Sequence, residues 1–239
     1  MAPDRNRRAI LLSSATTAAC LVATACGSTE SPSRTAAATK GNEAKEEVSA
    51  NEDLMREHGV LDRILLVYEA GVARDSKDPA LTAALHRAAD LVSTFIEQYH
   101  EKLEEDFIFP LLEKAQRHAT EVRTLRQQHV VGRQVTQAIL RLTAGTAASD
   151  QVALAKSVQA FVRMYRPHAA REDTIIFPTL HEIVTPSQLA DLGERFEDVE
   201  HERFGKEGFE SILRQVEELE RTLGTYDLSQ FTPASVSPA

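Results

Sequence analysis

The chain has 239 residues, of which 42% are hydrophobic and 5% aromatic, and it contains no Trp. This composition is sufficient for one buried core and is typical of a helical protein rich in Ala and Leu. The formal net charge is −9, and this acidity, without a clustered basic face, argues against a nucleic acid partner.

Residues 1–26 have the pattern of an export signal and not of a folded element. Three arginines, at positions 5, 7 and 8, precede an apolar run from Ala9 to Ala25, and Cys26 follows directly. This order resembles a bacterial lipoprotein signal. The resemblance implies cleavage before Cys26, a lipid on its thiol, and anchoring of the mature chain to the outer face of a membrane in the bacterial cell envelope.

Two alternatives remain for this segment. An uncleaved transmembrane anchor is one, although the run contains Ser and Thr and is shorter than the roughly 20 apolar residues of a membrane span. Twin-arginine export is the other, because Arg7-Arg8 resembles that motif without its usual flanking residues. If Cys20 leaves with the signal and Cys26 carries lipid, no thiol remains for a disulfide or a catalytic nucleophile.

Residues 27–50 are rich in Ser, Thr, Ala and Glu and have no apolar period, which predicts a flexible linker. Residues 51–185 then show helical periodicity. The first helix is expected to begin near Asn51 or Glu52, with Asn51 as its cap, and to fade between Ala70 and Arg74.

The second predicted helix starts at Asp78-Pro79 and is broken or kinked at Pro110. The third runs from about Thr120 to Thr143, and the fourth from about Asp150 to Ile176. Together they predict an all-α fold, an up-down four-helix bundle.

Residues 186–225 follow a Pro-containing boundary and predict an additional charged helix packed on the bundle. It is expected to be interrupted near Gly205 and Gly208. Residues 226–239, with two prolines, predict a disordered tail.

The bundle sequence contains an internal repeat, because two stretches share five identities in one ungapped frame. The frame pairs His100 with His168, Glu104 with Glu172, Phe109 with Phe177, Pro110 with Pro178, and Leu112 with Leu180. Each copy therefore carries His-x-x-x-Glu, which places imidazole and carboxylate on one face of a helix. The apolar stripes around both pairs indicate that this face points into the core.

A lone histidine precedes each copy on an apolar stripe, His58 before the first and His129 before the second. Four helices thus direct four imidazoles and two carboxylates into one interior. Such buried groups are costly unless they are paired or bind metal. Imidazole with carboxylate is a donor set that suits iron, manganese or zinc.

These residues resemble the hemerythrin-like, or HHE cation-binding, family of four-helix bundles, over roughly residues 51–182. The resemblance implies a non-haem di-iron centre. In that centre His58, His100, His129 and His168 are terminal ligands, and Glu104 and Glu172 are bridging carboxylates.

One departure from the family concerns oxygen. The oxygen-carrying hemerythrins place an additional histidine on the third helix through His-x-x-x-His, whereas here Leu125 and Arg133 stand four residues from His129. This departure argues against reversible oxygen carriage. Glu101 resembles an extra carboxylate of some hemerythrin-like sensor domains and is a further candidate ligand.

Other polar residues near the motifs receive less weight. Tyr99 and Tyr165 are predicted to fill the core, although either hydroxyl could reach a metal-bound molecule. Asp106 and Asp173 are predicted to be exposed charges, with the orientation of ligating imidazoles as the alternative. The remaining histidines, at positions 86, 118, 181 and 201, are predicted to lie outside the cluster.

Three functions fit this pattern. The favoured one is a binding protein that binds or senses oxygen or another small diatomic at the cell envelope. The alternative is a di-iron redox enzyme that handles peroxide, oxygen or nitric oxide, or a protein of iron storage or repair. A metal that only stabilises the bundle is the third. The sequence does not predict the oligomeric state.

Overall fold

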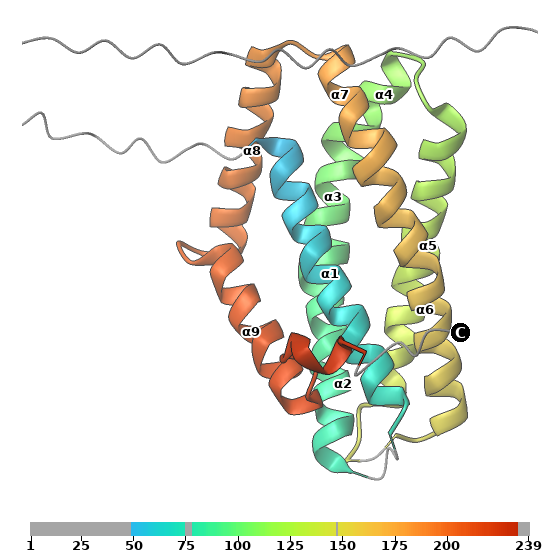
Figure 1. The fold of residues 1–239 in the computed structure, drawn as a ribbon. Coiled ribbons are helices and arrows are strands. Elements are labelled where there is room, and N and C mark those ends of the chain that lie inside the picture. The colour runs from blue at the N-terminus through green and yellow to red at the C-terminus, as the bar shows by residue number, and fades with distance from the viewer. Residues whose placement is uncertain (1–48, 75–77, 147, 234–239) are drawn as a thin grey trace, which may run out of the picture. The chain divides into compact units, whose positions relative to one another are not determined.

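The computed structural model describes residues 49–74, 78–146 and 148–233. The predicted export signal with Cys26, nearly all of the predicted linker and the end of the tail lie outside these residues. Within the described ranges the chain forms helices and their connections, without a strand (Figure 1). None of the helices in those ranges is long and apolar enough to span a membrane.

The first helix, α1 (Ala50–Val72), begins earlier than the sequence indicated, because Ser49 and not Asn51 caps it. The Ser49 hydroxyl accepts a hydrogen bond from the Glu52 backbone amide, and the Glu52 carboxylate accepts one from the Ser49 amide at 3.0 Å. This reciprocal capping box satisfies two of the free amides at the helix start. Asn51 is buried instead, and its side-chain amide donates to the Phe177 carbonyl at 2.8 Å.

The second helical stretch is continuous through Pro110, so the predicted break does not occur. It comprises α2 (Pro79–Leu91), the π-helix η1 (Val92–His100), α3 (Glu101–Leu103), the π-helix η2 (Glu104–Ile108) and α4 (Phe109–Lys114). Pro110 lies in the first turn of α4, so its missing amide hydrogen falls at the junction with the π-helix η2. The preceding π-turn widens the helix and changes its hydrogen-bond register.

The second copy of the repeat has the same construction. After α5 (Ala119–Leu142), the chain forms α6 (Gln151–Arg171), the π-helix η3 (Glu172–Ile176) and α7 (Phe177–Ile183). The helix thus continues past Ile176, where the sequence suggested its end. Both π-turns, η2 and η3, begin at the glutamate of His-x-x-x-Glu, and π-turns of this kind are frequent at functional sites.

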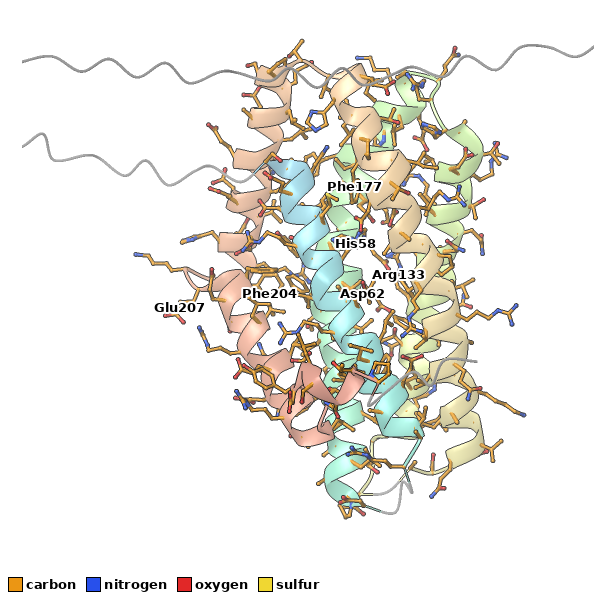
Figure 2. All side chains as sticks on the ribbon, in the orientation of Figure 1. His58, Asp62, Arg133, Phe177, Phe204 and Glu207 are labelled. Carbon is orange, nitrogen blue, oxygen red and sulfur yellow. The ribbon has the colours of Figure 1, made fainter. Side chains whose placement is uncertain are left out.

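The C-terminal part forms two helices, α8 (Pro186–Phe204) and α9 (Gly208–Leu223), followed by the short 3-10 helix η4 (Leu228–Phe231). Gly205 separates α8 from α9 with a φ of 76°, which favours glycine. In Figure 1, α1 lies between these two helices and α6, and the residues of α1 pack against all three. The additional helices therefore cover one side of α1, and Glu207 at their connection points outward (Figure 2).

A charged pair joins α9 to α1 at the edge of this interface. Arg63 donates from Nε to Glu220 Oε1 at 2.9 Å and from Nη2 to Oε2 at 2.5 Å. The Glu220 side chain is only 6% exposed, and Arg63 is its charged partner. A second pair, Arg87 with Glu218, joins α2 to α9 but is 53% and 64% exposed.

We expect Arg63→Ala to lower the free energy of unfolding by about 1–3 kcal/mol, because it leaves a buried carboxylate without its charged partner. Urea denaturation measures this loss, and amide hydrogen exchange should increase in α9. Arg87→Ala is the control and should leave the midpoint unchanged, since exposed ion pairs contribute little. Equal losses in the two variants would contradict this account of the α1–α9 contact.

Candidate metal centre

The structure brings the six residues of the sequence pattern together in the interior. His58 lies on α1, His129 on α5 and His168 on α6, whereas His100 and Glu104 lie on the second helical stretch and Glu172 begins η3. All six are 0–3% exposed. Figure 2 shows His58 beside Phe177, whose ring stacks on it at a centroid distance of 5.5 Å.

The imidazoles form two pairs through their Nε2 atoms. His58 and His100 have Nε2 atoms 3.0 Å apart, and His129 and His168 have theirs 3.3 Å apart. Two nitrogen ligands with metal bonds of about 2.1 Å, about 90° apart at one cation, lie about 3.0 Å from each other. The spacing of each pair therefore suits two ligands of one metal ion.

The two glutamates connect the pairs. Glu104 places Oε1 3.6 Å from His100 Nε2 and Oε2 3.4 Å from His129 Nε2. Glu172 places Oε2 3.0 Å from His168 Nε2 and 3.5 Å from His58 Nε2. A carboxylate in this position can bridge two cations about 3.5–4 Å apart.

The carboxylate oxygens also lack hydrogen bonds. Both side-chain oxygens of Glu104 and of Glu172 are buried without a partner of hydrogen-bond geometry. Orphaned buried acceptors are costly, and a cation between the imidazoles would satisfy them. The donor set fits a bound metal ion, since Glu104 combines with His58 and His100 in one cluster and with His129, His168 and Glu172 in another.

The opposite ring nitrogen of each imidazole is held by a second set of residues. Nδ1–H of each ring donates to an oxygen: His58 to Asp173 at 2.7 Å, His100 to Glu57 at 2.7 Å, His129 to Glu105 at 3.1 Å, and His168 to Gln128 at 2.9 Å. These bonds fix each ring so that Nε2 carries the lone pair toward the interior. The rings are therefore oriented as metal ligands.

The charges of the metal-free site indicate where protons take the place of a cation. Burial opposes a charge on His58, but the hydrogen bond to Asp173 and the nearby carboxylate of Glu172 outweigh it and raise the pKa of His58 to about 10. Burial likewise opposes a charge on His129, and Glu104 with Glu105 raises its pKa to about 10. Burial lowers the pKa of His100 to about 4. Without a cation, His58 and His129 therefore carry protons, which a bound cation would replace.

Glu101, the further candidate ligand, lies with Glu105 and His129 in a third group that could hold a cation, but its two oxygens also have other partners. Its Oε1 accepts from the Tyr165 hydroxyl at 2.6 Å, and its Oε2 accepts from Arg133 Nη1 at 2.8 Å. Arg133 also donates to Glu105. Arg133 thus places a guanidinium beside the site, at one of the two positions where the oxygen carriers could have their additional histidine. Burial raises the pKa of Glu101 to about 7.

Sequence reasoning missed three of the four residues that hold Nδ1 and gave too little weight to the fourth. Asp173, predicted to be an exposed charge, bonds His58, whereas Asp106 is 55% exposed and pairs with Lys102. The missed residues are Glu57, Glu105 and Gln128. Each is the sequence neighbour of a candidate ligand, and this adjacency within both repeat copies was the available signal.

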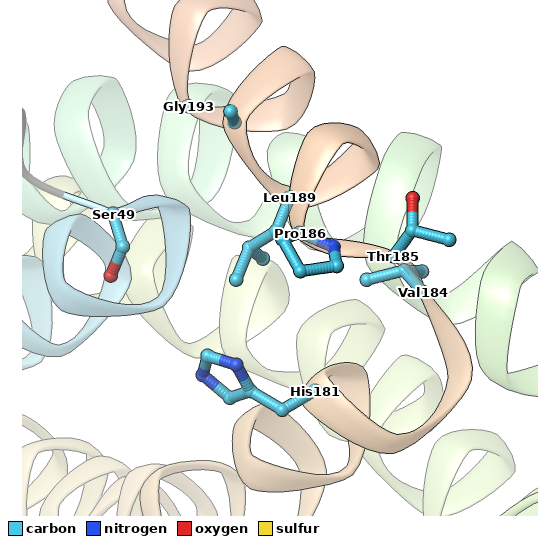
Figure 3. Close-up of a pocket in the computed structure, with 8 residues that line it drawn as sticks. Ser49, His181, Val184, Thr185, Pro186, Leu189 and Gly193 are labelled. Carbon is cyan, nitrogen blue, oxygen red and sulfur yellow. The ribbon is translucent and has the colours of Figure 1, made fainter.

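The remaining histidines lie away from the two pairs. His86 contacts Thr143, and His118 contacts Thr179. His181 lines a pocket of about 350 Å³ with Ser49 and residues at the start of α8 (Figure 3). This pocket contains none of the candidate ligands, and His201 is exposed on α8.

Comparisons with known proteins also indicate a cation-binding domain over most of the helical part. A family model described as the hemerythrin HHE cation-binding domain matches residues 49–180. Uncharacterized proteins of Mycobacterium bovis and of two Mycobacterium tuberculosis strains are each 45% identical over 236 residues, covering 96% of this chain and 91% of their own length. No solved structure matches the chain.

Gly132 provides the space for the Tyr165 hydroxyl, because a Cβ at this position would lie 2.0 Å from the hydroxyl oxygen. We expect Gly132→Ala to destabilise the fold by about 1–3 kcal/mol through overpacking. Thermal unfolding checks this, and the cost should be smaller in a Tyr165→Phe background, where the hydroxyl is absent.

Gly59→Ala is the matched control, since nothing lies within 4 Å of a Cβ at that helical position. It should raise the unfolding temperature because alanine favours a helix over glycine by about 1 kcal/mol. A Gly132→Ala protein as stable as the Gly59→Ala protein would show that Tyr165 does not require this space.

Proposed function

Because the chain belongs to the hemerythrin HHE cation-binding family, we propose that it holds a non-haem di-iron centre that binds or senses oxygen or another small diatomic. In this proposal His58 and His100 serve one iron, His129 and His168 serve the other, and Glu104 and Glu172 bridge them. Bound iron would supply one-electron redox chemistry and positions for a small ligand. The arrangement proposed for residues 51–185 is an up-down four-helix bundle.

One observation carries the proposal: four buried carboxylate oxygens without hydrogen bonds face two imidazole pairs whose Nε2 atoms are 3.0 and 3.3 Å apart. Two cations would satisfy all of these groups together. Manganese or zinc suits the same donors, so iron is the part of the proposal that rests on the family.

The protein's own residues also limit what the centre does. Phe177 stacks on His58, and Phe109 stacks on His129 at 5.6 Å, so apolar rings cover the two lone histidines. Arg133 places a guanidinium beside the site, at one of the two positions where an oxygen-carrying hemerythrin could have its additional histidine. These features support sensing or irreversible chemistry more than reversible carriage.

A second candidate function, a redox enzyme for peroxide, oxygen or nitric oxide, or iron storage or repair, is favoured by one contact. Tyr165 is 1% exposed, its ring lies 5.3 Å from that of His168, and its hydroxyl donates to Glu101. A buried phenol bonded to a carboxylate can hold or pass a proton beside the centre. Turnover assays decide between the two candidates.

The proposed function is tested by metal analysis of the full chain, purified under nitrogen. We expect two irons per chain and an oxo-bridged absorption band on exposure to air. His129→Ala should lose bound iron, whereas His86→Ala, a histidine outside the cluster, should retain it. No iron, or one zinc per chain, would refute the di-iron centre.

The behaviour of the band separates the uses of the centre. A band that disappears under vacuum would mean reversible oxygen binding despite Arg133. A band that persists without turnover of peroxide or nitric oxide supports sensing, and measurable turnover supports the enzyme. Unfolding curves before and after metal removal isolate a purely structural metal, which would raise stability without any of these responses.

The proposed location is the outer face of a membrane in the cell envelope, through a lipid on Cys26, and the sequence pattern before Cys26 supports it. Cys26→Ser should move the protein from the membrane fraction to the soluble fraction or leave its signal uncleaved, with the bundle still folded. Fractionation and intact-mass measurement check this result. Cys20→Ser is the control and should leave lipidation unchanged; an unlipidated wild-type chain would contradict the proposal.

A further inference from the structure

The repeat extends beyond the candidate ligands to the residues that hold them. In each copy, the residue before the lone histidine bonds Nδ1 of the His-x-x-x-Glu imidazole: Glu57 bonds His100, and Gln128 bonds His168. The residue after the glutamate bonds the lone histidine of the other copy: Glu105 bonds His129, and Asp173 bonds His58. The second set of residues thus follows the same pseudo-twofold relation as the ligands.

Charge breaks this symmetry at one position. Glu57, Glu105 and Asp173 are carboxylates, whereas Gln128 is a neutral amide. A cation on Nε2 leaves the ring proton on Nδ1, and this favours the ionised form of the acceptor.

Gln128 and His168 also line an open pocket. It has a volume of about 390 Å³ between α5 and α6, and Leu125, Pro167 and Arg171 contribute to its walls. Gln128 is half-buried in the wall of this pocket, and His168, itself 3% exposed, lies directly behind it. Among the other Nδ1 partners, the side chain of Glu57 is 2% exposed and that of Asp173 is 28% exposed.

We propose that His168 is the ligand that would detach when a divalent cation enters or leaves. The pocket between α5 and α6 receives the detached imidazole, and Gln128 is the positioning residue that makes His168 labile. This proposal rests on the di-iron function proposed above and specifies how that centre is loaded.

The physical reason is the strength of the bond on Nδ1. To leave a cation, an imidazole must turn and break that hydrogen bond. A hydrogen bond to a carboxylate is roughly twice as strong as one to a neutral amide, and it also makes the imidazole a stronger donor to the metal. His168 therefore has the weakest hydrogen bond on Nδ1 of the four imidazoles. It also lines the pocket between α5 and α6, which offers space for the ring to turn.

The number of ligands does not make this half of the centre weaker. Glu104, His129, His168 and Glu172 offer donor atoms within 4.8 Å of one another, which is the larger of the two clusters that contain Glu104. The inference accordingly concerns the rate of cation release and not the affinity alone.

The test is the release of ferrous iron from the fully loaded chain to a chelator under nitrogen. Wild-type protein should release one iron fast and one slowly. Gln128→Glu should slow the fast phase by about 10-fold or more, the size of effect that outer partners of metal ligands usually have. Glu57→Gln, its mirror image, should accelerate the slow phase.

Gln127→Glu is the matched control, because it adds the same charge one residue away on the exposed face of α5. It should leave both phases unchanged. The proposal is overturned if Gln128→Glu releases iron at wild-type rates, if Gln127→Glu slows release equally, or if Gln128→Glu affects only the slow phase. Because Glu57 is buried, the release rate of Glu57→Gln is used only if this variant unfolds cooperatively without metal. The result for Gln128→Glu decides the test by itself.

Failure of the di-iron function is visible before the chelator is added. A wild-type chain that binds fewer than two irons refutes that function and this inference together. A chain that binds two irons but releases them in one phase, unaffected by Gln128→Glu, refutes the inference and leaves the function standing.

Discussion

The structure depends on the burial of four imidazoles and two carboxylates in one helical interior. Groups of this kind are stable there only when each polar atom has a partner. The Nδ1 atoms have such partners, but the carboxylate oxygens of Glu104 and Glu172 do not. Without metal, protons on His58 and His129 compensate part of the negative charge of these two buried carboxylates. Two cations would compensate it fully. The fold is thus arranged to receive positive charge at its centre.

The helical construction around this charge is the same in both halves. A π-turn begins at each of Glu104 and Glu172, and a Phe-Pro pair follows it into a short α-helix. The widened turns place the glutamate, the next acidic residue and the phenylalanine on the centre together. Glu105 can thereby reach His129 while Phe109 stacks on the same ring, and Asp173 and Phe177 do likewise at His58.

The two halves differ in ways that bear on chemistry. Arg133, Glu101 and Tyr165 form a polar network on the His129 side, and Gln128 replaces a carboxylate behind His168. Neither difference changes the candidate ligands themselves. Both change what lies next to the ligands. One side has a guanidinium, a phenol and a pocket, and on the other side both imidazoles are held by carboxylates. Different behaviour of the two metal positions follows from the protein and not from the donor atoms.

The sequence by itself determined the helical fold class and the set of residues that meet in the interior, because an i, i+4 pair and an apolar stripe are local properties of a helix. Only the tertiary structure decided which groups hold the rings. Glu57 and His100 are 43 positions apart, and Tyr165 reaches Glu101 only because Gly132 leaves space. The cap at Ser49, the bond between Asp173 and His58 and the continuity through Pro110 likewise depended on the tertiary structure. Distances across a bundle are set by the packing of every helix, and no local pattern contains them.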